Sequence, residues 1–198
     1  MAENQSVEFF ETQFQRQVRE REYALNPFET RALDYLAGTV LDFGCGLGNL
    51  ALEAGRRGHR VVAVDASPAA IDRINTTAQQ EGLPVTAIRA DIETWTIDQR
   101  YDTIVAIGCS CFSGARERWS CSPPSRSTST PGGRAIVNVL MEGTTFLGMF
   151  HANNYCLFAR DEIEERFAGW RILDSRHETF PAPGETRKEF STVIAEKP

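Results

Sequence analysis

The sequence predicts an α/β fold, with a doubly wound sheet that is mostly parallel and ends in an antiparallel hairpin. Short apolar strands alternate with helical segments between residues 39 and 140, and strands separated by helices form parallel βαβ units. Two strand-like runs near the C-terminal end are joined by a short link, which is typical of a hairpin. The chain has 198 residues, of which 41% are hydrophobic, so it can form one domain with a complete core.

The N-terminal part of the chain, residues 1–37, is expected to form a helical cap ahead of a domain over residues 38–198. Apolar side chains fall near one face of a helix in residues 6–36, among Glu, Gln and Arg. Pro27 is placed to open a second helix in this part, because proline suits the first helical position. Gly38 then ends that helix.

Seven strands and three more helices are expected after the cap. The helix over 67–81 has the clearest ends: Ser67 can cap it, Pro68 stands at its first position, and Gly82 closes it. The other two helices are expected at 47–57 and 160–168. The strands are expected at 39–43, 60–64, 84–88, 101–107, 134–140, 170–180 and 188–196, with a turn at 181–184 between the last two.

Composition and charge restrict the partners of the protein. Asp and Glu outnumber Lys and Arg by 27 to 21, so the formal net charge is −6 and no nucleic-acid partner is expected. A negative protein suits a neutral or cationic ligand better than a polyanion. No apolar run reaches the ~18 residues of a membrane span, and the first residues lack the pattern of a secretory signal. The five cysteines, an odd number, indicate reduced thiols in the cytoplasm.

A glycine-rich loop follows the strand at 39–43. Gly44, Gly46 and Gly48 have the spacing G-x-G-x-G, which permits a tight turn and lets a ligand approach the backbone. The dinucleotide fingerprint has its third glycine one place later, where Asn49 stands. Asp42, just before the loop, would repel a pyrophosphate but could complement a cation. The loop therefore indicates a ligand other than a dinucleotide.

Two acids follow the next two strands. Asp65 ends the strand at 60–64 and could accept hydrogen bonds from both hydroxyls of a ribose. Asp91 follows the strand at 84–88 and could accept one from an adenine amino group. These positions are the carboxyl ends of parallel strands, where open α/β sheets bind ligands. The alternative is that the glycines only form turns and the acids are ordinary surface residues.

The motifs together resemble the class I S-adenosylmethionine-dependent methyltransferases. The matching segments are Val40–Leu50, Val61–Ser67, Ala90–Trp95, Tyr101–Gly108 and Pro131–Leu140. The resemblance implies a Rossmann-like sheet of seven strands, the last pair being the hairpin, and S-adenosyl-L-methionine as cofactor. The cofactor-binding residues that it implies are Asp42, Gly44, Gly46, Gly48, Asp65, Ala66, Asp91, Ile92, Ile107 and Gly108.

The order of the parts is also similar to that of the tellurite-resistance (TehB-like) methyltransferases. These parts are Tyr101–Val105, a Pro-Gly-Gly at 131–133, a Phe-x-x-x-Glu-Ile helix from Phe158, then Trp170 and a last strand over 190–197. This narrower resemblance implies a small-molecule acceptor with a soft nucleophile, such as a thiol or a chalcogen oxyanion.

The sequence assigns no general base. An ionised thiolate or oxyanion needs none, whereas a neutral nucleophile does. The walls of the site are expected from an N-terminal helix carrying Phe10, Phe14 and Tyr23, from the segment after Gly108, and from 141–158. The weak candidates for catalysis are His151, Tyr155, His177 and Arg187.

Residues 109–130 do not fit the pattern around them. The fold needs a helix here to carry the chain from the fourth strand to the fifth, but two consecutive prolines interrupt it. A flexible loop is one interpretation. A metal site of Cys109, Cys111 and Cys121 is not favoured, because C-x-C spacing with no nearby His is poor, and no metal is expected.

We favour a third interpretation, in which residues 109–130 are translated out of frame. Cysteine codons begin with TG, so reading one base earlier turns Cys109 into Leu, Met or Val. If the nearby serines use TC codons, the shifted frame makes 109–113 an apolar run and gives 119–125 a helical period. The shifted frame thus supplies the strand end and the helix that the fold lacks.

A small-molecule methyltransferase is therefore the leading functional hypothesis. Two alternatives stay open: a cofactor-binding but catalytically impaired relic, and an NAD-dependent oxidoreductase on the same fold. The sequence leaves the acceptor and the oligomeric state undetermined.

Overall fold

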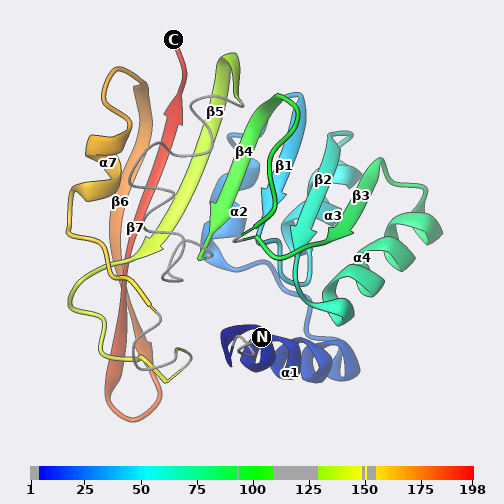
Figure 1. Ribbon diagram of the computed structural model, residues 1–198, viewed down its shortest axis with the longest axis horizontal. Helices are drawn as coiled ribbons and strands as arrows, with labels where there is room; N and C mark the ends of the chain where they lie inside the picture. Colours follow the sequence, from blue (N-terminus) through cyan, green and yellow to red (C-terminus); the bar gives the residue numbers. More distant parts are fainter. Residues whose placement is uncertain (1–4, 93, 109–128, 149, 151–154) are drawn as a thin grey trace.

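Figure 1 shows a computed structural model of the protein, which describes residues 5–92, 94–108, 129–148, 150 and 155–198. Within these residues, seven strands form one sheet in the order β3-β2-β1-β4-β5-β7-β6. The pairings from β3 to β5 are parallel, and β7 is antiparallel to both β5 and β6. The strands are β1 (Thr39–Phe43), β2 (Arg60–Asp65), β3 (Val85–Arg89), β4 (Tyr101–Ile107), β5 (Ser129–Leu140), β6 (Arg171–Ala182) and β7 (Thr186–Glu196).

Helices cover both faces of this sheet. The helices are α1 (Gln5–Glu20), α2 (Pro27–Leu33), α3 (Asn49–Arg56), α4 (Pro68–Glu81) and α7 (Glu162–Arg166). On one face, α2, α3 and α4 bury side chains such as Leu50 and Ile74 against β1, β2 and β4. On the other, Ile163 of α7 and Phe167 just after it pack on β4, β5 and β7. The expected doubly wound, mostly parallel sheet with an antiparallel C-terminal hairpin is confirmed.

The ends of α4 are those that its sequence predicts. The Ser67 hydroxyl accepts a hydrogen bond from Ala70 N at 3.1 Å, and Pro68 occupies the first position. Gly82 closes the helix with a φ of +64°, a left-handed conformation that glycine adopts without strain. These contacts lie within a few residues of each other, so the local sequence decides them.

Strand β5 begins earlier than the sequence predicts, at Ser129 rather than at residue 134. Gly132 N donates to Lys197 O at 3.1 Å, and Lys197 N donates to Gly133 O at 2.8 Å. Backbone pairing with the end of the chain thus extends the strand through a Pro-Gly-Gly that local propensity assigns to a turn.

The β6–β7 hairpin is longer than predicted. The two strands pair as far as Ala182 and Thr186, so their turn lies at 183–185 rather than at 181–184. The pairing of β7 with β5 stops at Phe190, so the hairpin continues past the sheet (Figure 1).

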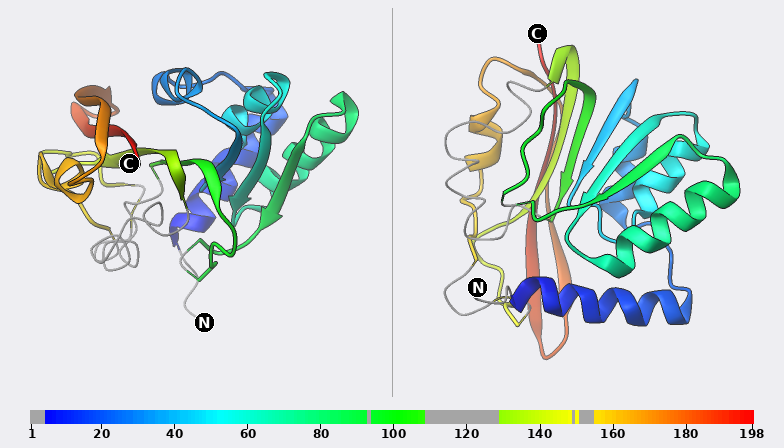
Figure 2. Two further views of the ribbon diagram at one scale, coloured as in Figure 1. Left: turned by 90° about the horizontal axis from the view of Figure 1, so that it is seen from above. Right: turned by 45° about the vertical axis from the view of Figure 1, so that its right-hand side comes forward.

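Helix α1 lies across the carboxyl ends of the strands, below the arrowheads of β1 to β4 in Figure 1 and along the lower edge of the right-hand view in Figure 2. It contacts α4 at one end. Among the helices in the described part of the chain, none has both the length and the apolar character needed to cross a membrane.

Candidate functional site

The glycine loop joins β1 to α3 in a conformation that needs glycine. Gly44, Gly46 and Gly48 have φ values of +73°, +51° and +71°, a region that other residues enter only at a cost of about 1–2 kcal/mol. Gly44 N and Cys45 N donate to Val64 O at 2.8 and 3.0 Å. These bonds attach the loop to the end of β2, so the two strand ends form one rigid edge.

Two of these glycines also have close neighbours. A Cβ at Gly48 would lie 2.4 Å from Cγ1 of Ile74, so this glycine lets α3 pack on α4. A Cβ at Gly46 would lie 3.1 Å from Cζ of Phe14, whose ring comes from α1. The Gly46 position therefore faces the space between the loop and α1.

The carboxylate of Asp65 is held by backbone donors on both oxygens. Oδ2 accepts from Gly46 N at 2.8 Å, and Oδ1 accepts from Ser67 N at 2.9 Å. Burial raises the pKa of Asp65, and these N–H groups partly oppose that rise. The Ser67 hydroxyl also donates to Glu11 of α1. Each carboxylate oxygen has a second lone pair, so Asp65 can still accept hydrogen bonds from a ligand.

Asp42 is a buried acid with an unused acceptor. Its side chain is 4% exposed, and Oδ2 has no hydrogen-bond partner among the described residues. Burial raises the pKa of Asp42 to about 8, with further contributions from the charges of Glu29 and Asp65. A buried polar atom without a partner is rare and indicates a missing donor.

These groups surround one cavity of about 360 Å³. It lies at the carboxyl ends of β1, β2 and β4 and is closed by α1 and α2. Among the described residues that line it, none is Lys, Arg or His. Nine of the ten expected cofactor-binding residues line it, namely Asp42, Gly44, Gly46, Asp65, Ala66, Asp91, Ile92, Ile107 and Gly108. The tenth, Gly48, is outside the lining and serves the packing of α3.

The N-terminal helix contributes part of the wall that the sequence predicts. Phe10 and Phe14 line the cavity, together with Gln13 and Gln17. Tyr23 does not line it, because its ring stacks on the guanidinium of Arg73, with 3.9 Å between the guanidinium carbon and the ring centroid.

Sequence reasoning missed several polar residues of the lining, among them Asn26, Glu29 and Asn49. Asn26 and Glu29 form a capping box at the start of α2: Glu29 N donates to Asn26 Oδ1 at 2.9 Å, and Asn26 N donates to Glu29 Oε2 at 2.7 Å. The spacing Asn-x-x-Glu is a recognisable signal for such a box. It predicts the helix start, but not that the box faces a ligand cavity.

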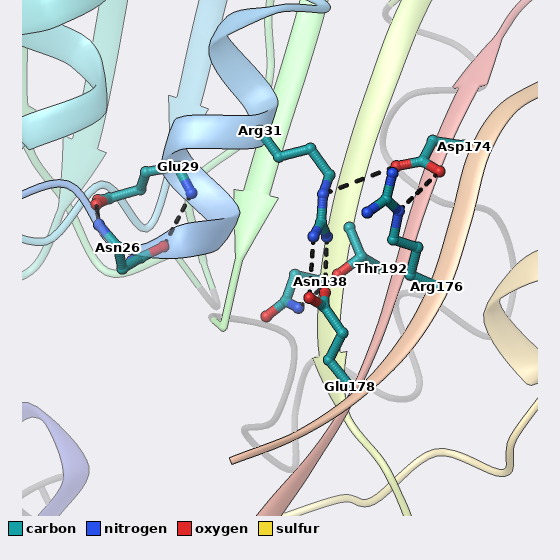
Figure 3. A network of polar contacts seen from close by, with 8 residues as sticks. All are labelled: Asn26, Glu29, Arg31, Asn138, Asp174, Arg176, Glu178 and Thr192. Carbon is teal, nitrogen blue, oxygen red and sulfur yellow. Dashed lines mark hydrogen bonds and ion pairs between the residues drawn. The ribbon is translucent and has the colours of Figure 1, made fainter.

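An ion pair holds α2 in place beside β6. Arg31 donates to both carboxylate oxygens of Glu178, at 2.6 and 2.9 Å, and lies 3.8 Å from Asp174 (Figure 3). The hydrogen bonds from Arg31 lower the pKa of Glu178. Bidentate pairs of this kind fix orientation as well as distance, so the helix that carries Glu29 has a defined position.

The candidates for catalysis do not meet in the cavity. Tyr155 stacks on a phenylalanine ring, with centroids 5.4 Å apart. His177 Nε2 lies 2.8 Å from a main-chain carbonyl oxygen just before α7, and Arg187 pairs with a glutamate at 2.8 Å. These three are absent from the described lining. His151 lies outside the described residues, as does most of the segment 109–130.

Comparison with known sequences points to one kind of domain. Residues 40–133 match the family model described as a methyltransferase domain. Hemagglutinin 1 of Eikenella corrodens is 29% identical over 165 residues, which are 80% of this chain and 54% of that protein. The probable S-adenosyl-L-methionine-dependent methyltransferase TehB of Haemophilus influenzae is 24% identical over 164 residues, 80% of this chain and 57% of that protein. The chain thus spans less than two thirds of the length of these relatives.

Solved structures share the fold. The crystal structure of TehB from Haemophilus influenzae matches with a TM-score of 0.70 at 20% identity, over 88% of this chain and 63% of that one. A TehB-like SAM-dependent methyltransferase from Corynebacterium glutamicum matches with a TM-score of 0.62 at 20% identity, over 96% and 98% of the two chains.

Proposed function

We propose that this chain, which belongs to the class I S-adenosylmethionine-dependent methyltransferases and is TehB-like among them, transfers a methyl group from S-adenosylmethionine to a small-molecule acceptor. The observation that carries the proposal is the convergence of Asp42, the glycine loop and Asp65 on one cavity at the carboxyl ends of β1 and β2. Ligands of open α/β sheets bind at this edge.

The cavity suits the cofactor in size and in the chemistry of its lining. Its volume of about 360 Å³ is within the ~300–1,000 Å³ of small-molecule sites. We assign the ribose hydroxyls to Asp65, whose carboxylate the loop already orients. We assign the adenine to Asp91 and Ile92, which line the same cavity. The unpartnered Oδ2 of Asp42 supports a ligand that brings a donor or a positive charge.

The residues of this chain act mainly by orientation and by exclusion of water. When bound, S-adenosylmethionine supplies a methyl group activated by a sulfonium, which is already a good leaving group. Alignment of two reactants can supply ~7–11 kcal/mol of the barrier. Phe10 and Phe14 of α1 line the cavity, as do Ile107 at the end of β4 and Gly108 just after it, and these groups help to keep water from the reacting atoms.

For the acceptor we propose a soft nucleophile, a thiol or a chalcogen oxyanion. The likeness to TehB in the order of the parts supports this class. The absence of basic side chains from the described lining, together with its carboxylates, favours the neutral thiol of the two. None of the three described candidates, Tyr155, His177 and Arg187, lines the cavity, so the thiol gives its proton to water and is methylated as its thiolate, which needs no general base.

Two measurements test the proposal. Calorimetric titration should detect binding of S-adenosylhomocysteine and not of NADH; the reverse result would identify an oxidoreductase. A screen with labelled cofactor over thiols, selenite, tellurite and small amines should then find a methylated product. A protein that binds S-adenosylhomocysteine but methylates nothing in the screen would be the impaired relic.

We also propose that residues 109–130 are read out of frame. Sequencing the gene across this segment decides the point. A clean frame that uses AG codons for the serines near Cys109 would remove the support. If the protein carries the segment as it stands, methyl transfer is expected to be weak while cofactor binding is retained, because the cofactor-binding residues lie outside it.

A further inference from the structure

Helix α1 turns one face to the cavity rather than to a protein core. Four of its residues line the cavity, namely Phe10, Gln13, Phe14 and Gln17, and steps of three and four residues place them on one face of a helix. The side chains described for this helix, at 8–20, are all at least partly exposed. Phe10 packs against the smallest of three core clusters, and the two larger clusters contain no described residue of α1. The helix therefore covers the cavity without forming part of the main core.

Two side-chain contacts hold α1 and the residues just after it against α4. The Ser67 hydroxyl, at the start of α4, donates a hydrogen bond to Glu11 in the middle of α1. Three residues beyond the end of α1, the Tyr23 ring stacks on the guanidinium of Arg73, which belongs to α4. We call these two contacts the latch. Glu11, Tyr23 and Arg73 are not among the described residues that line the cavity, so the latch lies almost wholly outside the binding site.

The link between α1 and α2 is suited to act as a hinge. Residues 22–26 form neither helix nor strand. Arg21, at the end of α1, has a φ of +56°, which residues other than glycine rarely adopt. The far side of the link is fixed, because Asn49 Nδ2 donates to Ala24 O at 3.1 Å and Asn26 belongs to the capping box of α2. A rotation of α1 would therefore be confined to residues 21–23.

The two helices that the latch joins differ in how firmly the core holds them. Ala70 and Ile74 of α4 have no exposed surface, whereas α1 has no fully buried side chain in its described part. Elements with few buried apolar contacts open at a lower free-energy cost than core elements. A ligand in the cavity would contact Phe10 and Phe14, and so would favour the closed position of α1.

We propose that α1 is a lid that turns about residues 21–23 to admit and release the ligand, and that the latch of Glu11 with Ser67 and Tyr23 with Arg73 keeps it closed. The inference rests on the proposed function, in which the ligand is the cofactor. Since three of the four latch residues lie outside the lining, weakening the latch speeds entry and exit together and leaves the affinity nearly unchanged.

The double variant Glu11→Ala/Tyr23→Ala tests the latch, because it removes both contacts and keeps Ser67 as the cap of α4. Stopped-flow mixing with S-adenosylhomocysteine, followed by tryptophan fluorescence, measures the association and dissociation rate constants. Both should rise about tenfold or more, as expected for the loss of one hydrogen bond to a charged group. Their ratio, the Kd, should change by less than about threefold. Glu8→Ala is the matched control: it removes an exposed glutamate from the same helix and should leave both rates unchanged.

Unchanged rates in a folded double variant would overturn the inference. So would a weaker affinity at an unchanged association rate, because the two residues would then shape the site rather than close it.

Hydrogen exchange tests the lid in the wild type, without any variant. In the free protein the amides of α1 should exchange about 100-fold or more faster than those of α4, and S-adenosylhomocysteine should slow them. Equal protection of α1 and α4 in the free protein would overturn the inference. Fast exchange in α1 together with no binding of S-adenosylhomocysteine would refute the proposed function and still support the opening of α1.

Discussion

Replacing Asp65 by alanine is expected to weaken the binding of S-adenosylhomocysteine by about two orders of magnitude. The carboxylate is assigned to two ribose hydroxyls, and a hydrogen bond to a charged group contributes ~1.5–3 kcal/mol. Two bonds at the lower value give about 3 kcal/mol, or roughly 100-fold in affinity. The same carboxylate accepts from Gly46 N and Ser67 N at 2.8 and 2.9 Å, so the loop also loses its order.

The loss of those two backbone partners gives the variant a second, independent signature. Each unpaired N–H costs ~1–3 kcal/mol if water cannot reach it, so a destabilisation of about 2 kcal/mol is expected. For a chain of this length that lowers the melting temperature by ~4–8 °C. A thermal scan thus verifies both that the variant folds and that the carboxylate supports the loop.

The assay is a calorimetric titration with two further variants. Asp72→Ala removes an exposed acid from α4 and should bind like the wild type. Asp65→Asn keeps the shape but turns an NH₂ group toward one of the two N–H donors, so its affinity should stay low. A folded Asp65→Ala protein that binds as tightly as the wild type would refute the assignment of the ribose to this carboxylate.

Three other predictions follow from single contacts. The pKa of Asp42 is raised to about 8 in the folded protein. Between roughly pH 4 and 8 the folded protein therefore keeps a proton on this side chain, whereas the unfolded chain has released it. The ligand-free protein should therefore lose stability as the pH rises through this window. The free energy of unfolding, measured in urea, should depend less on pH for Asp42→Asn. The same pH dependence in both proteins would contradict a buried, protonated acid. Arg31→Met removes the ion-pair partner of Glu178, whose side chain is 24% exposed. Losing a partner costs little at the surface and ~3–5 kcal/mol when the pair is buried, so for this half-buried pair the free energy of unfolding should fall by about 2 kcal/mol. The double variant Arg31→Met/Glu178→Leu should recover part of that loss in the same denaturation experiment, and no recovery would count against the pair. Gly48→Ala adds a clash and a strained φ, so it should cost ~2–4 kcal/mol. Gly58→Ala, with φ +89° and no atom within 4 Å of the new Cβ, should cost only about 1–2 kcal/mol in the same experiment, and similar costs for both would rule out the clash.

Elements whose ends are decided locally were predicted well. Helix α4 is the clearest case, since Ser67, Pro68 and Gly82 lie within a turn of the ends that they define. The start of β5 was predicted too late, because Ser129 pairs with Tyr101 of β4 and the backbone of Gly132 and Gly133 pairs with Lys197 at the other end of the chain. His177 was selected for its residue type and faces a main-chain carbonyl away from the cavity.

The order of strands and helices, the glycine loop and the acids at the strand ends are all determined by the sequence alone. Parallel strands carry their carboxyl ends to one edge, so the meeting of Asp42 with Asp65 needs no further information. The tertiary structure decided the rest: that α1 and α2 close the cavity, that Asp42 is buried deeply enough to raise its pKa, and that Glu29 lines the same space. Arg31 and Glu178, which hold α2 there, are 147 residues apart in the chain. Helix caps and strand alternation depend on a few neighbouring residues, whereas burial and the placement of a distant helix depend on the packing of the whole chain.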